Sequence, residues 1–198
     1  MKSAIIALVT SVILVSGCSN KAVESHEYLL RPAGTVVPYD VNASPTLELH
    51  TVRIADYLDR EGLILESSDN QIQAARYHRW AEPLRGSLKR YLQVAISQRT
   101  GISVAADLQQ GSGADVRIDV IVHQLHGGAG GDVRMVAEWQ LSNGKRHANV
   151  LMRSEFADTV RISADGYSAV VDAHEQLLDA LAEAVADGIG RLEKTSLD

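Results

Sequence analysis

The sequence predicts an α+β domain in which two amphipathic helices pack on one face of a mostly antiparallel sheet. Three observations lead to this fold class. Residues 115–160 alternate apolar and polar side chains as strands do, residues 83–100 and 167–192 repeat apolar side chains with the period of a helix, and turn-forming residues separate these segments. Because the strand alternation is one-sided, we expect one face of the sheet to be covered and the other to be wet or paired.

Residues 1–17 have the features of a secretory signal peptide. Lys2 precedes an apolar run from Ala4 to Leu14, and small residues then lead to Cys18, the single cysteine of the chain. The run is too short to span a hydrocarbon core, which takes about 20 apolar residues. Small residues followed by cysteine resemble a bacterial lipobox, which implies cleavage between Gly17 and Cys18 and lipid attachment to the cysteine sulfur. The alternative is an ordinary signal peptide with an incidental cysteine.

Lipid attachment would fix the position of the whole protein. Each buried methylene contributes about 0.8 kcal/mol, so the acyl chains of a lipoprotein form an effectively permanent anchor. Ser19 follows the cysteine, and resemblance to the usual sorting pattern places the protein on the periplasmic face of the outer membrane. Residues 18–27 form the lipidated N-terminus and a polar tether. Nine extended residues reach at most about 30 Å, so the domain, residues 28–194, stays close to its membrane.

The composition excludes several classes of function. An apolar fraction of 45% and a charged fraction of 22% are typical of a globular domain. The net charge of −6 argues against a nucleic acid partner, because phosphate binding needs a basic face. With its one cysteine acylated the domain has no disulfide, so packing must supply its stability.

The first half of the domain is predicted to contain strands, a loop and a hairpin. Residues 28–30 form a short first strand, and residues 32–45, which hold three of the four prolines, form a loop. Residues 47–54 are a strand whose apolar phase shifts between Leu49 and Val52, which indicates a bulge. Apolar residues on both sides of the turn cluster at 67–70 then predict a hairpin.

A helix follows the hairpin. Pro83 suits the first helical turn, because N–H groups at that position have no partner within the helix and the one that proline lacks costs no hydrogen bond. Gly101 ends the helix. Its apolar face consists of Leu84, Leu88, Tyr91, Leu92, Ala95 and Ile96.

Residues 115–160 are predicted to form a three-stranded meander. Val116 to Val122 alternates regularly, the glycine cluster at 127–131 makes the first connection, and Val133 to Leu141 alternates again. Asn143-Gly144 is the preferred two-residue hairpin turn, since both positions need a positive φ. A third strand runs over about 148–159, and a long amphipathic helix over about 167–192. The apolar side of that helix consists of Val170, Ala173, Leu177, Leu181, Ala184 or Val185, Gly188 and Leu192.

Catalytic and metal-binding patterns are weak throughout. The glycine run 127–131 fits neither a dinucleotide loop nor a P-loop, and it lies between two strands. His123 and His126 lie on a path from strand to loop, where they do not face together, and no cysteine or acidic cluster accompanies them. No serine occupies a G-x-S-x-G elbow, and no cysteine is free to act as a nucleophile. We therefore expect neither an enzyme nor a metal or cofactor site.

Trp80 lies just before the helix that begins at Pro83. A tryptophan at this position packs under the helix, or it forms a partly exposed anchor for a partner, since tryptophan is enriched in binding hot spots. We favour the packing role.

Several short motifs follow one another in a specific order. After the lipobox come Tyr28-Leu29, the segment Ile-Ala-Asp-Tyr-Leu-Asp-Arg at 54–60, Trp-Ala-Glu-Pro-Leu at 80–84, a strand that ends at 119–125, and Gly166-Tyr167 at the start of the last helix. This order resembles the ABC-type transport auxiliary lipoproteins over nearly the whole mature chain. The candidate partner-contact or packing residues in these motifs are Tyr57, Arg60, Trp80, Pro83 and Leu84.

The resemblance implies a non-enzymatic docking or auxiliary subunit of an MCE-type intermembrane lipid transport system. Its partners would be an MCE-domain protein that spans the periplasm, the inner-membrane complex of that protein, and the membrane that holds the acyl chains. Self-association into a homo-oligomer stays open. Two other functions also stay open, namely a stand-alone periplasmic lipoprotein with an apolar cavity for a lipid or small ligand, and a general envelope-integrity lipoprotein.

Overall fold

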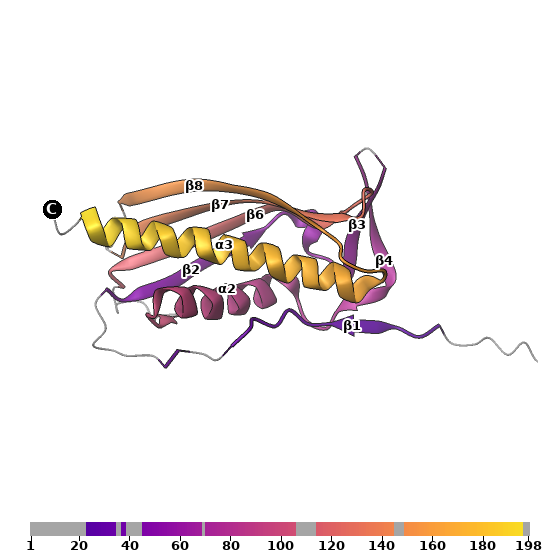
Figure 1. Ribbon diagram of the computed structural model, residues 1–198, viewed down its shortest axis with the longest axis horizontal. Helices are drawn as coiled ribbons and strands as arrows, with labels where there is room; N and C mark the ends of the chain where they lie inside the picture. Colours follow the sequence, from indigo (N-terminus) through magenta and orange to yellow (C-terminus); the bar gives the residue numbers. More distant parts are fainter. Residues whose placement is uncertain are drawn as a thin grey trace, which may run out of the picture.

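The computed structural model describes residues 23–34, 37–38, 45–68, 70–105, 114–144 and 149–195. Gly17 and Cys18, with the rest of the predicted signal segment and lipidation site, lie outside these residues. Within the described part, eight strands form one sheet, and the helices α2 (Leu84–Thr100) and α3 (Tyr167–Thr195) lie together over one of its faces (Figure 1). This arrangement confirms the predicted fold class.

One side of the sheet is an antiparallel meander of three long strands, as the alternation predicts, and its last strand is an edge of the sheet. These strands are β6 (Val116–Gly128), β7 (Asp132–Asn143) and β8 (Val150–Arg161). The pairing of β6 with β7 runs from Val116 opposite Asn143 to Gly128 opposite Asp132. The tight connection between them contains Gly131, which has a φ of 75°, so the glycine cluster forms the hairpin loop expected of it.

Four parallel pairings complete the sheet, and the sequence did not reveal them. Since β7 occupies one edge of β6 along its length, two strands share the other edge. These are β2 (Leu47–Ile54), which runs parallel to the first half of β6, and β3 (Gly62–Ser68), which joins it where Leu65 lies opposite Gly127. The two-residue strand β5 (Val104–Ala105) lies parallel to β2 on its other side.

The predicted hairpin is formed by β3 and β4 (Gln71–Trp80). The short strand β1 (His26–Tyr28) lies parallel to the end of β4, with Tyr28 opposite Trp80. This pairing brings the beginning of the described chain to the corner of the sheet from which α2 starts (Figure 1).

The bulge predicted in β2 is present, since the register of β2 against β6 shifts between Leu49 and Thr51. The two-residue turn predicted at Asn143-Gly144 is wrong. Asn143 still pairs with Val116 in β7, and neither Asn143 nor Gly144 has a positive φ. The N–H of Asn143 donates to the carbonyl of Asn149 instead, at 3.0 Å.

Both helices have the faces that their apolar spacing predicts. Gly101 caps the C-terminus of α2 in the left-handed conformation, with a φ of 71°. Pro83 is the N-cap residue of α2 and lies just before the first helical residue. In α3, Val185 is buried and Ala184 only partly so, which decides between the two alternatives at this turn.

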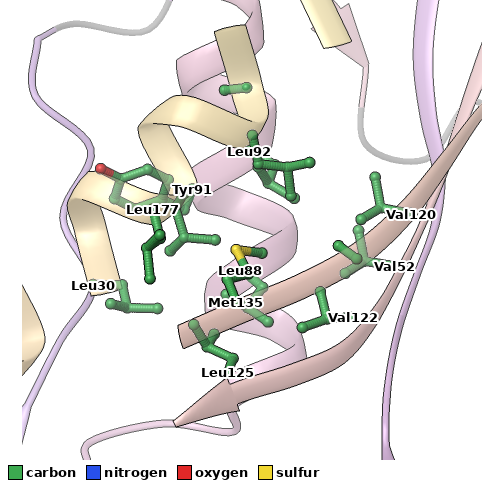
Figure 2. Packing of buried hydrophobic residues seen from close by; sticks show 14 of the residues in the cluster. Leu30, Val52, Leu88, Tyr91, Leu92, Val120, Val122, Leu125, Met135 and Leu177 are labelled. Atoms are coloured by element: carbon green, nitrogen blue, oxygen red, sulfur yellow. The ribbon is translucent and has the colours of Figure 1, made fainter. Parts of the chain in front are cut away.

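The layer between helices and sheet is filled with apolar side chains. Figure 2 shows Leu88, Leu92 and Leu177 from the two helices in one cluster with residues of β2, β6 and β7, such as Val52, Val120 and Met135. Leu88, Leu92, Leu177, Val120 and Met135 are fully buried. This continuous core counts against the alternative of a ligand cavity between helices and sheet. None of the described helices is long and apolar enough to cross a membrane.

Candidate functional site

A surface hollow of about 370 Å³ lies beside the first turn of α2. It is lined by Glu27, Asp59, Arg60, Glu61, Arg79, Trp80, Ala81, Glu82, Pro83 and Leu84, and we call it the Arg60 hollow. It brings together four of the five candidate residues of the predicted motifs, since Arg60 and the segment 80–84 approach each other across a loop and a strand end. Tyr57 is not part of this lining.

Backbone hydrogen bonds hold the three segments of the hollow together. The N–H of Trp80 donates to the carbonyl of Glu61 at 2.7 Å, and the N–H of Ala81 donates to the carbonyl of Tyr28 at 2.9 Å. The loop that carries Arg60 follows a single 3₁₀ turn, η2 (Asp56–Leu58), whose Leu58 is buried. The hollow is therefore a built feature of the fold at the junction of β1, β4 and α2.

Each carboxylate in the hollow has an arginine partner. Arg79 bridges Glu61, at 3.3 Å, and Glu27, at 3.6 Å. Arg85 pairs with Asp59 at 3.0 Å. Glu82 accepts a hydrogen bond from the Ser87 hydroxyl at 2.6 Å and pairs with Arg90, and these contacts lower its pKa, the Ser87 bond most strongly.

The guanidinium of Arg60, and the Nε atom of Arg79 taken by itself, have no acceptor of this kind. Among the described residues, no carboxylate or hydrogen-bond acceptor engages the exposed guanidinium of Arg60. The Nε of Arg79 is buried and has no hydrogen-bond partner in the described part of the chain. A buried donor without an acceptor costs about 1–3 kcal/mol, whereas the exposed guanidinium of Arg60 is hydrated and open to an anionic group placed in this hollow.

Trp80 itself is packed. It is 7% exposed and meets the imidazole of His174 in α3 edge to face, with ring centroids 5.6 Å apart. Leu84, which follows it into the helix, is also buried. Trp80 and Leu84 therefore form the floor of the hollow, while Arg60 and Glu61 form its exposed rim.

Tyr57 points into a different environment. Its ring meets that of His126 edge to face, with centroids 6.1 Å apart, and burial raises the pKa of its hydroxyl. Of the five candidate residues, Tyr57 is thus separate from the other four.

A buried histidine was not singled out from the sequence. His174 is almost fully buried, its Nδ1 lies 2.7 Å from the carbonyl oxygen of Val170, and burial lowers its pKa to about 4. The signal was available, because His174 lies four residues after Val170 and three before Leu177 on the apolar side of α3.

The sheet face opposite the helices is charged. We define the open sheet face by the outward residues of β2, β6, β7 and β8 around a shallow hollow of about 430 Å³, namely His50, Thr51, Arg53, Asp119, Ile121, Glu138, Gln140 and Arg153. Arg153 donates to the Gln140 side chain at 2.8 Å, and His123 lies 3.1 Å from Glu138. Charges of both signs thus alternate across neighbouring strands. Among the described residues, no group of histidine, cysteine and acidic side chains is arranged to hold a metal ion.

Comparisons with known proteins agree on one family. The family described as the ABC-type transport auxiliary lipoprotein component matches residues 28–186. The intermembrane transport lipoprotein PqiC of Escherichia coli (strain K12) is 27% identical over 179 residues, which cover 90% of this chain and 93% of PqiC, and PqiC of Shigella flexneri matches equally well.

Two crystal structures share the fold. A protein described as uncharacterized superposes with a TM-score of 0.70 at 24% identity, over 84% of this chain and 99% of its own. A protein from Xanthomonas campestris superposes with a TM-score of 0.68 at 16% identity, over 86% of this chain and 99% of its own.

Proposed function

Because the chain belongs to the family of ABC-type transport auxiliary lipoprotein components, we propose that it is a non-enzymatic docking subunit of an MCE-type intermembrane lipid transport system. In this proposal, acyl chains on Cys18 hold it on the periplasmic face of the outer membrane. It receives there the far end of an MCE-domain protein, which reaches across the periplasm from its inner-membrane complex. The observation that carries the proposal is the likeness to PqiC along nearly the entire length of both chains.

The geometry supports docking in two ways. The filled core between helices and sheet leaves recognition to the surface of the domain. The open sheet face presents charges of both signs on rigid strands, and charge patterns of this kind steer and orient a protein partner. A tether of about nine residues keeps the domain within about 30 Å of its anchor, so a longer partner must bridge the periplasm.

Photocrosslinking in intact cells tests this docking surface. A photoreactive amino acid at Asp119 lies on the open sheet face, and the same amino acid at the exposed position Gln176 of α3 serves as the matched control. We expect the Asp119 position to yield a product that contains an MCE-domain protein, identified by mass spectrometry, and the Gln176 position to yield none. Equal products from both positions, or products without an MCE protein, would contradict the docking surface.

A further inference from the structure

We propose that the Arg60 hollow binds the zwitterionic phosphoethanolamine headgroup of a membrane phospholipid, with the phosphate held by Arg60 and Arg79. The inference deepens the proposed function, because it rests on the anchor at Cys18 that brings this surface to a membrane. It assigns the domain a direct contact with lipid that is separate from the open sheet face.

The unsatisfied donors of the hollow suit a phosphate. Arg60 has no acceptor among the described residues, and Nε of Arg79 is buried without one. Guanidinium groups bind phosphate oxygens through paired N–H donors, and such charge-assisted bonds are among the strongest in proteins. Pro83 and Leu84 line the same hollow at the start of α2, where no side chain caps the helix and no acidic residue lies in the first turn. The positive end of that helix dipole adds to the field of Arg60.

The charge of the rim selects the kind of headgroup. Asp59 and Glu82 pair with Arg85 and Arg90, which leaves Glu27 and Glu61 beside Arg60 and Arg79. These two carboxylates and two guanidinium groups balance, so the hollow has no excess charge that would favour a headgroup of one sign only. Glu27 and Glu61 are themselves mostly exposed, so an ammonium group beside the phosphate can reach them. A headgroup that carries both charges can place its phosphate beside Arg60 and its ammonium group beside Glu27 and Glu61.

The location and size of the hollow also suit a headgroup. Glu27 lines the hollow and lies nine residues after Cys18, so the anchored chain keeps this corner of the domain within about 30 Å of the bilayer. Tethering turns lipid binding into an intramolecular event, in which a weak site is occupied because its ligand is always near. A volume of about 370 Å³ accommodates a headgroup and its glycerol, and leaves the acyl chains in the membrane.

The test uses the mature acylated protein, extracted in a mild detergent and titrated with phospholipids by native mass spectrometry. We expect a one-to-one adduct with phosphatidylethanolamine that is stronger than the adduct with phosphatidylglycerol. Arg60→Gln should weaken the phosphatidylethanolamine adduct about tenfold. Arg53→Gln removes an exposed arginine from the open sheet face and is the matched control, expected to stay within about twofold of the wild type.

Equal retention of lipid by the Arg60 and Arg53 variants would overturn the proposal, as would a preference for phosphatidylglycerol. If Arg60→Gln loses a protein partner in pull-downs while its lipid adduct is unchanged, the hollow recognises protein and the proposal is wrong.

Hydrogen exchange on the wild-type chain gives a readout that does not depend on any variant. Added phosphatidylethanolamine should slow exchange at residues 59–61 and 79–84, and unchanged exchange there would contradict the site. Because purified protein is used, failure of this test leaves the docking of an MCE protein untouched.

Discussion

Gly188 of α3 lies directly against the indole ring of Trp139 in β7. A Cβ atom built on Gly188 would be 2.5 Å from Cη2 of Trp139 and 3.3 Å from the sulfur of Met152. Trp139 is fully buried in the layer between helix and sheet. The approach of the longest helix to the meander is therefore set by the absence of a side chain at position 188.

Replacing Gly188 with alanine should push α3 away from the sheet. Overpacking of this kind costs about 1–3 kcal/mol, and we expect the free energy of unfolding in urea to fall by that amount. Gly190 lies in the same helix, and a Cβ atom added there would meet nothing within 4 Å, so Gly190→Ala should instead stabilise by about 0.5–1 kcal/mol through helix propensity. Equal effects of the two substitutions would show that position 188 is not the contact that sets the spacing.

Trp80 is expected to act mainly through packing. Truncation to alanine removes a buried indole and its edge-to-face contact with His174 of α3, and should cost about 3–5 kcal/mol. Denaturant unfolding followed by circular dichroism measures the loss, and Trp80→Phe, which keeps most of the apolar volume, should lose clearly less. A Trp80→Ala variant of unchanged stability that no longer recovers its partner would favour the anchor role over packing.

His174 should make the stability of the domain depend on pH. Its pKa is about 4 in the folded chain and about 6.5 when unfolded, so the unfolded chain takes up the proton first as the pH falls. The stabilisation is therefore complete above about pH 6.5 and is lost between pH 6.5 and 4, by about 3 kcal/mol. Unfolding in urea across this range measures the change.

A matched pair of variants isolates this group from the others that titrate in the same range. His174→Phe should flatten the dependence on pH, while Gln176→Ala, which replaces an exposed and non-titratable residue of the same helix, should leave it as in the wild type. His78 and Glu82, whose pKa values are also lowered, are present in both variants and cancel in the comparison. An unaltered dependence in His174→Phe would show that another group carries it.

Sequence patterns predicted most of the helices and strands, because the spacing of apolar residues and the turn preferences of single residues depend only on near neighbours in the chain. The phase shift in residues 47–54 even located the bulge between Leu49 and Thr51. Strand pairing is not local, and nothing in β2 or β6 alone indicates that they run parallel. Asn143-Gly144 was misread because pairing with β6 keeps Asn143 in the strand, where the tertiary context overrides a turn preference.

The candidate site likewise combines residues that local motifs indicated with contacts that only the fold shows. The order of motifs pointed to Arg60 and Trp80, but only the fold shows that they line one hollow, since the hydrogen bond from Trp80 to Glu61 joins distant segments. The unpartnered Nε of Arg79 depends on three-dimensional surroundings and has no signature in the sequence. Tyr57 belongs to the same motif as Arg60, yet Tyr57 lies within the 3₁₀ turn and Arg60 after it, and the two side chains reach different surroundings.

The lipid anchor at Cys18 is the central claim, and the mass of the mature chain tests it directly. The protein is expressed at native level in a Gram-negative host, extracted from purified outer membranes and measured intact, with Cys18→Ser as the control. We predict a mature chain that begins at Cys18 and carries three acyl chains, and a serine variant that is absent from the outer-membrane fraction. A mature chain without acylation at Cys18, or a serine variant that still reaches the outer membrane, would contradict the claim.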